Sequence, residues 1–325
     1  MFGEVVARAR AAGGAGAAGD RAYWTSREVR KEVEGVGGGL GGDDVGRQVL
    51  AWDSGRQKHF ENKLFQSLDS RDHDGFKKYL DKMNDFEVHM LACAVDEHGL
   101  TLVHACSHHG MFESLRLLVD LFKQSSLKIL KEKPLSSPAS RMSSSLSSNS
   151  SRKSKWTSLL TEEQMTLQIN QVVRAWVDLP TGTRDKWTAL HLACRHKTGI
   201  LFQYLVEELG ADMTLKSTSG IDLLHKSAYH DNTYVLTYLI EKGGFDVTAS
   251  LDDLKNTPLH YACDQKTDFA PTWLIAYGAD INAPNEDGNT PLHLLVKNPF
   301  EFRSSKLVKE LICKGANRDL KNALE

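Results

Sequence analysis

The sequence predicts an all-α solenoid in which short helix-turn-helix units stack side by side. Four motifs indicate this fold, because each ends in a histidine and they recur at a fixed pitch. The histidines His191, His225, His260 and His293 are separated by 34, 35 and 33 residues. A glycine-containing turn repeats in the same phase, two helices later. Two short helices cannot bury their apolar faces alone, so units with this pitch have to stack on their neighbours.

Each unit has a recognisable start and end. The four starts are Thr188-Ala-Leu-His191, Asp222-Leu-Leu-His225, Thr257-Pro-Leu-His260 and Thr290-Pro-Leu-His293. Threonine and aspartate accept hydrogen bonds from the first helical turn, and proline suits the first helical position. The ends are marked by Gly210, Gly244, Gly278 and Gly315. Glycine readily takes the left-handed conformation that ends a helix.

This pattern resembles the ankyrin repeat, whose signature is a Thr-Pro-Leu-His-x-Ala helix start and a Gly-Ala-Asp turn. An earlier copy begins at Gly99-Leu-Thr-Leu-Val-His104 and continues past Gly110 into a helix expected over 111–122. Residues 60–82 read as a degenerate first unit. The resemblance implies about six repeats and a binding fold, but it says little about the partner.

Segments outside the repeats divide the chain. Residues 1–56 are rich in Gly and Ala and predict a disordered tail, because they offer few large apolar groups for a core. Repeats are expected over 57–123 and again over 161–325, ending in an incomplete further unit. Between them, residues 124–160 predict a disordered, basic, serine-rich insert. The capping pattern Thr161-Glu-Glu-Gln164 then begins a helix that returns the chain to the stack.

The insert supports several interpretations. Serine occupies 11 of the 19 residues from 136 to 154, and residues 123–155 hold eight Lys or Arg against Glu132. Phosphorylation of Ser143, Ser151 or Ser154 would add negative charge and act as a switch. The segment is otherwise a tolerated surface insertion. A third interpretation is a nuclear-localisation signal at residues 152–155.

Composition narrows the class of protein. The formal net charge is −2, so no global charge favours nucleic acid, and no apolar run approaches the roughly 20 residues of a membrane span. Cys106, Cys194 and Cys263 occupy nearly the same place in their units, where a small buried residue is needed. This usage predicts a reducing compartment, the cytosol or else the nucleus. No metal or cofactor is expected, because zinc-ligand spacing and phosphate-binding glycine loops are missing from the sequence.

The histidines favour structure over catalysis. The pairs His104/His108, His191/His196 and His225/His230 could in principle hold a metal or transfer protons. The first histidine of each pair is, however, the motif residue, whose ring nitrogens are needed to bond the helix start and the adjacent hairpin. We therefore expect a protein that is not an enzyme and has no catalytic residues.

The predicted function is to hold a partner protein, with the chain itself monomeric. Hairpin tips and first helices carry side chains free of packing duty. Trp187 is the foremost candidate anchor, although it could equally pack on the adjacent hairpin. Lys186 and Lys255 stand where the repeat pattern prefers glycine. The candidate partner-binding residues are Trp187, Lys186, Arg195, His196, Tyr229, His230, Lys255, Asp264, Gln265, Glu286 and Asp287.

A rival interpretation comes from the last three units. From residue 220 to residue 318 they resemble the cytosolic ankyrin module of the Asp-His-His-Cys palmitoyltransferases. That family adds membrane helices and a cysteine-rich catalytic domain, which are not in this sequence. The resemblance implies a fragment that recruits substrate proteins for acylation. Apolar spans and an Asp-His-His-Cys motif beyond Glu325 in the reading frame would support it.

Overall fold

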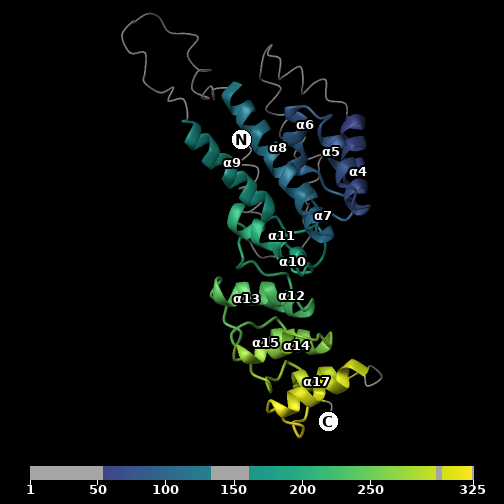
Figure 1. Cartoon of the computed structure of the whole chain (residues 1–325), viewed down its shortest axis with the longest axis vertical. Coiled ribbons are helices and arrows are strands. Elements are labelled where there is room, and N and C mark those ends of the chain that lie inside the picture. The colour runs from purple at the N-terminus through teal and green to yellow at the C-terminus, as the bar shows by residue number, and fades with distance from the viewer. Residues whose placement is uncertain (1–53, 133–160, 298–301, 324–325) are drawn as a thin grey trace, which may run out of the picture. The chain divides into compact units, whose positions relative to one another are not determined.

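The computed structural model describes residues 54–132, 161–297 and 302–323, and their regular secondary structure is helical. The chain divides into two compact units (Figure 1). Among the described residues, the first unit holds 54–96 and 113–176, and the second holds 97–112 and 177–323. The all-α class predicted from the repeat pitch is confirmed.

The first unit is built from longer helices. Its elements are α4 (Ser54–Asp69), α5 (His73–Leu80), α6 (Asp85–Met90), the 3-10 turn Leu91–Cys93, α8 (Phe112–Glu132) and α9 (Glu162–Val177). Phe122 of α8 packs against Trp176 of α9, with ring centroids 5.2 Å apart, and also stacks on His89. Both large rings are almost fully buried. The apolar spacing of α9 thus buries its face against α8 (Figure 1).

Local capping fixes where these helices begin. At α9, the Thr161 hydroxyl accepts from the backbone N–H of Gln164 at 3.3 Å, and the Gln164 side chain accepts from the Thr161 N–H at 3.0 Å. This is the reciprocal capping box predicted from the sequence. Asn84 and Glu87 form the same arrangement at the start of α6.

The helix α8 runs further than the sequence predicts. The expectation was a helix ending near Phe122 and an insert beginning at residue 124, whereas α8 continues to Glu132. Ser125 and Ser126 are buried, and their hydroxyls meet Asp85 at 3.2 Å and His89 at 3.0 Å. The serine-rich composition hid two packing positions of a helix. The rest of the insert and residues 1–53 of the N-terminal tail lie outside the described residues, whereas residues 54–56, expected to be disordered, belong to α4.

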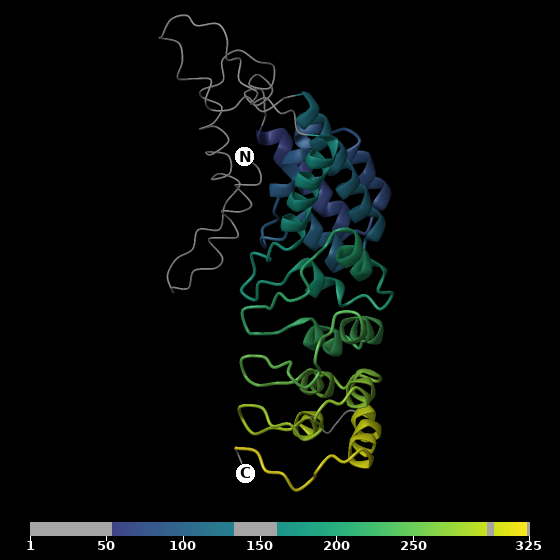
Figure 2. The same ribbon diagram turned by 90° about the vertical axis from the view of Figure 1, so that its left-hand side faces the viewer.

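The second unit is a stack of hairpins and helix pairs. Its helices are α7 (Leu102–His109), α10 (Ala189–Ala193), α11 (Ile200–Gln203) with the π-helical turn Tyr204–Glu208, α12 (Leu223–Tyr229), α13 (Thr233–Glu241), α14 (Pro258–Asp264), α15 (Ala270–Ala276), α16 (Pro291–Val296) and α17 (Phe302–Cys313). The first helices α7, α10, α12, α14 and α16 pack in that order. Figure 2 shows the successive hairpins on one side of this stack and the helices on the other.

Within the second unit, the motif histidines join each helix-turn-helix repeat to the next repeat. In His191, Nδ1 lies 2.8 Å from the Thr188 hydroxyl at the start of its own helix, and Nε2 lies 3.3 Å from the Ile221 carbonyl of the following hairpin. His104, His225 and His260 repeat this pattern, with Nε2 2.8–2.9 Å from the carbonyls of Leu179, Asn256 and Asn289. The structural use predicted for these rings is confirmed.

Small residues let the first helices approach one another. Ala193 and Ala262 are almost completely buried two positions after their motif histidines, and Ser227 fills the same place in α12. The thiols of Cys106, Cys194 and Cys263 are completely buried, while Cys313 is exposed. Burial raises the pKa of the three buried thiols, so they stay protonated.

Candidate protein-binding surface

Burial keeps two of the motif histidines neutral. Desolvation lowers the pKa of both His104 and His191 to about 4. Their Nδ1 atoms accept from the backbone N–H groups of Thr101 at 3.2 Å and Thr188 at 3.3 Å, which leaves Nε2 to donate to the next carbonyl. These rings are therefore occupied within the fold.

The hairpin tips form a row of linked loops. Within the hairpin that precedes α12, the Ser217 N–H donates a hydrogen bond to the Ile221 carbonyl at 2.9 Å. Each tip then bonds its predecessor, as when Thr218 N–H donates to the Asp185 carbonyl at 3.1 Å. The later links are Asp253 N–H to the Ser219 carbonyl, Glu286 N–H to the Leu254 carbonyl and Ala323 N–H to the Asp287 carbonyl. Backbone bonding fixes the tips, and exposed side chains such as Leu254, Glu286 and Asp287 lie on them.

Two lysines take a backbone conformation that favours glycine. Lys186 has φ of 53° and Lys255 has φ of 59°, where Gly220 and Gly288 at the other two tips have 72° and 75°. The departure from the repeat pattern therefore leaves these turns intact and adds local strain. Lys255 is exposed and Lys186 is half-buried.

Trp187 lies at the base of its hairpin and is half-buried. Its ring centroid lies 5.3 Å from that of His191 and 4.1 Å from the Nζ atom of Lys226. The same ammonium lies 5.3 Å from the ring centroid of Tyr229, whose side chain is exposed. The indole thus both packs within the fold, as the alternative interpretation holds, and shapes the surface of the first helices.

Lys226 was missing from the sequence-derived candidates. It precedes Tyr229 and His230 by three and four residues on α12, a spacing that puts all three on one helix face. That periodicity could have identified it. The contact with Trp187 could not be anticipated, because it joins two successive units.

Arg195 and His196 follow α10 and behave differently. Arg195 is exposed, with Nη1 3.4 Å from Nε2 of His108. His196 is half-buried, and its Nε2 lies 2.9 Å from the Ser107 carbonyl and 3.0 Å from that of His108. Its ring also fills the space beside Gly110, where an added Cβ would lie 2.7 Å away. His196 is therefore largely a packing residue, and it does not face outward freely as expected.

Four of the remaining candidates are exposed, and three of these are acidic. Asp264 and Gln265 lie at the end of α14, and Glu286 and Asp287 lie on the last complete hairpin tip. Leu254, at the preceding tip, leaves 59% of its surface exposed. His230 ends α12 and is half-buried. The candidates therefore lie on hairpins, on first helices or directly after them, and they form no single cluster.

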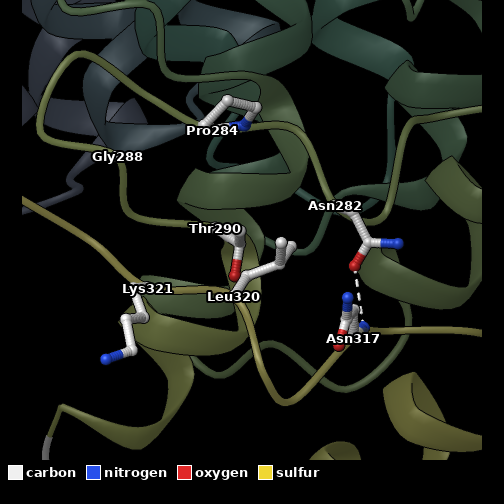
Figure 3. A pocket seen from close by; sticks show the side chains of 7 residues that line it. All are labelled: Asn282, Pro284, Gly288, Thr290, Asn317, Leu320 and Lys321. Atoms are coloured by element: carbon white, nitrogen blue, oxygen red, sulfur yellow. Dashed lines mark hydrogen bonds between the residues drawn. The ribbon is translucent and has the colours of Figure 1, made fainter.

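A hollow of about 400 Å³ lies beneath the last complete hairpin. Asn282, Pro284, Gly288, Thr290, Asn317, Leu320 and Lys321 line it. Figure 3 shows Leu320 beside Thr290, and the Asn317 backbone N–H donates to the Asn282 side chain at 2.8 Å. No titratable pair or nucleophile gathers among these lining residues.

Comparison with known families decides what the repeating unit is. The family described as "Ankyrin repeats (3 copies)" matches residues 224–322, and that described as "Ankyrin repeat" matches residues 185–218. This chain carries an ankyrin-repeat array. Ankyrin repeats are non-catalytic modules that mediate interactions between proteins.

Several known ankyrin-repeat proteins share part of this sequence. "SH3 and multiple ankyrin repeat domains protein 2" of Homo sapiens is 29% identical over 43% of this chain and 7% of its own length. "Putative palmitoyltransferase ZDHHC13" of Danio rerio is 31% identical over 35% of this chain, and "Palmitoyltransferase AKR1" of Lachancea kluyveri is 31% identical over 40%. The match covers 17% of each palmitoyltransferase. The similarity thus spans a small part of each relative.

Two further features concern the described residues alone. Within residues 54–132, 161–297 and 302–323, no helix is both long and apolar enough to cross a membrane. The same residues contain no group of three His, Cys, Asp or Glu side chains arranged to hold a metal ion. The candidate phosphorylation sites Ser143, Ser151 and Ser154 lie outside the described part of the chain.

Proposed function

We propose that this chain holds a partner protein on the hairpin tips and first helices of its second unit, without catalysing a reaction. The observation that carries this proposal is the contrast between the motif histidines, which bond within the fold, and the exposed side chains of the hairpin tips and first helices. The motif histidines other than His293 are buried and bonded within the fold, whereas Leu254 and Tyr229 expose apolar surface to solvent. Exposed apolar and aromatic groups on a rigid backbone are typical anchors for a protein partner.

Site-directed photo-crosslinking tests this proposal. A benzophenone amino acid replaces Leu254 or Tyr229 in the full chain, and a matched control replaces Leu167, an exposed apolar residue of α9 in the first unit. We expect the same protein to be crosslinked from 254 and 229 but not from 167. Equal capture from all three positions would show that binding is not directed to this surface.

Point variants then separate binding from folding. Leu254→Asp introduces charge at an exposed tip, so we expect partner capture to fall while the thermal unfolding midpoint stays unchanged. Trp187→Ala is expected to reduce capture as well, with some loss of stability, because the indole also packs on His191. Unchanged capture by both variants would contradict the proposed surface.

A second candidate function is the recruitment of substrate proteins to a palmitoyltransferase. The similarity to two palmitoyltransferases favours it, and both similarities cover about a third or more of this chain. Under this proposal the array binds the protein that is to be acylated. Translating the coding sequence past Glu325 tests it. Apolar spans and an Asp-His-His-Cys motif there would support it, and an unrelated catalytic domain would contradict it.

The serine-rich insert is proposed as a switch on the same interaction. Its sequence over 133–160 contains five Lys or Arg and no acidic residue. Phosphates on Ser143, Ser151 or Ser154 would reverse much of this positive charge. Replacing all three serines by glutamate should alter partner capture, whereas replacing them by alanine should not. Equal capture by both would leave the insert as a surface connection.

A further inference from the structure

Two cations lie at the first helices of two successive repeats, Arg195 after α10 and Lys226 on α12. Lys226 of α12 lies between the rings of Trp187 and Tyr229, at 4.1 Å and 5.3 Å from their centroids. Arg195, after α10, contacts His108 of α7 through Nη1. His196 and His230 lie beside these two cations. We call Arg195, His196, Lys226 and His230 the cationic patch.

The two cations of this patch form no ion pair with a carboxylate in the described part of the chain. Other lysines of the second compact unit do form ion pairs with carboxylates. Lys197 pairs with Asp231 at 3.7 Å, and Lys242 pairs with Glu207 at 3.5 Å. Asp185 attracts the Lys226 ammonium only from beyond ion-pair distance. The patch is thus a local excess of positive charge in a chain with a net charge of −2.

The groups of the patch repel one another. The pKa of His230 falls to about 4, first because the ring is buried and then because Lys226, Arg195 and His196 oppose its protonation. Burial also lowers the pKa of Lys226. Like charges that are partly removed from water are costly, and a bound anion would reverse that cost. Groups whose pKa is shifted by burial and by neighbouring charges are candidates for binding sites.

We propose that the cationic patch binds an anionic side chain, a carboxylate or a phosphate, on an extended segment of the partner protein. This inference rests on the proposed function and specifies its partner chemistry. The Lys226 ammonium and the Arg195 guanidinium hold the anion. The rings of Trp187 and Tyr229 cover an apolar or aromatic residue beside it.

The charges on the next units give the segment a direction. Asp264 ends α14, and Glu286 and Asp287 occupy the following tip, all exposed. A segment whose acidic residue sits on the patch would therefore bring basic or neutral residues to these carboxylates. A long polyanion such as RNA would instead meet them with repulsion. The surface fits a peptide of mixed charge better than nucleic acid.

Fluorescence anisotropy with short labelled peptides tests the inference on the full chain. Three peptides share one sequence with a central aromatic residue and C-terminal lysines, and they carry glutamate, phosphoserine or glutamine at the N-terminal positions. We expect at least one anionic peptide to bind at least about tenfold more tightly than the glutamine peptide. The glutamate and phosphoserine arms show which anion is preferred. Equal binding of all three overturns the inference.

Matched variants place the binding. The double variant Lys226→Gln with Arg195→Gln should bind the anionic peptide at least about tenfold more weakly than the wild type. The control is Lys297→Gln, at an exposed lysine after α16, which should change the affinity by less than about twofold. Because Lys226 packs on two rings, Arg195→Glu alone is a second test at an exposed position where folding is not at risk. Wild-type affinity in that variant, or tighter binding of duplex RNA than of either anionic peptide, overturns the inference.

The outcomes also separate this inference from the proposed function. Specific crosslinking from position 254 with no binding of the anionic peptides retains the proposed function and overturns the anion site. Binding of the peptides at the patch, with no protein crosslinked from 254 or 229, retains the anion site and overturns the proposed function.

Discussion

The Nδ1 atom of His225 lies 2.8 Å from Oδ1 of Asp222, where the other four units place a threonine hydroxyl beside the motif histidine. The same carboxylate oxygen accepts from the backbone N–H groups of Leu224 and His225, at 2.9 Å and 3.2 Å. Asp222 is buried, so one oxygen atom both caps α12 and orients the imidazole.

Removing this cap should destabilise the array. We expect Asp222→Ala to lower the free energy of unfolding by about 1–2 kcal/mol, because two buried backbone N–H groups lose their acceptor and the imidazole loses its contact with the carboxylate. Asp222→Thr should lose less, since threonine serves the same role at Thr188 and Thr257. Urea unfolding of the two variants measures the difference. Equal losses would show that the cap contributes little.

Acid should weaken the fold through its buried histidines. The folded-state pKa of His104 and of His191 is about 4, below the ordinary value of 6.5, so the unfolded chain binds more protons between these values. The stabilisation is complete above pH 6.5 and is lost as the pH falls toward 4. For each pH unit by which the pH falls within that window, protonation of each of these two histidines in the unfolded chain should lower the free energy of unfolding by roughly 1.4 kcal/mol.

The slope of stability against pH, measured by urea unfolding between pH 6.5 and pH 5, isolates one ring. His191→Gln should flatten this slope by an amount that approaches one proton toward pH 5, whatever its effect on stability at pH 7. His98→Gln is the control, since that side chain is exposed. A slope that does not change in His191→Gln would contradict the low pKa.

Glycine should improve the third hairpin. Lys255 is exposed and holds φ at 59°, so Lys255→Gly should raise the free energy of unfolding by about 1 kcal/mol. Lys297→Gly is the control, because that backbone has φ of −54° and gains nothing from glycine. Thermal unfolding ranks the two variants. A loss of stability in Lys255→Gly would mean that the strain is small.

Asp231 lies just before α13, and its side chain caps the start of α15 in the next repeat. Oδ1 of Asp231 accepts from the N–H groups of Phe269 and Ala270, at 3.0 Å and 2.8 Å, and so caps α15 from the preceding unit. Asp231 itself has φ of 55°. Asp231→Asn tolerates that conformation and keeps an acceptor, so we expect a small loss. Asp231→Gly removes the acceptor and should cost about 1 kcal/mol more in urea unfolding. A ranking in the opposite order would show that backbone strain outweighs the cap.

Much of the second unit could be predicted from its sequence because local chemistry repeats there. The capping residue, the inward leucine and the histidine recur in each unit, so the starts of α10, α12, α14 and α16 follow from spacing alone. The bonding of the motif rings follows as well, since each unit offers the same carbonyl to its neighbour.

Contacts between units, and departures from the repeat, could not be predicted. The position of Lys226 over Trp187 depends on the rotation of one unit against the next, which no local motif encodes. The end of α8 was predicted ten residues too early, because serines at 125 and 126 gave no sign that they would be buried. His196 was expected to face solvent, but its ring packs beside Gly110.

The three buried cysteines have a use that their chemistry suggests. Cys106, Cys194 and Cys263 report from different units, and each is shielded from solvent in the native state, whereas Cys313 is open to it. The alkylation rate of each thiol relative to Cys313 should therefore time the opening of its own unit. Alkylation of the native cysteines therefore shows whether a bound ligand protects one repeat from local opening or all of them.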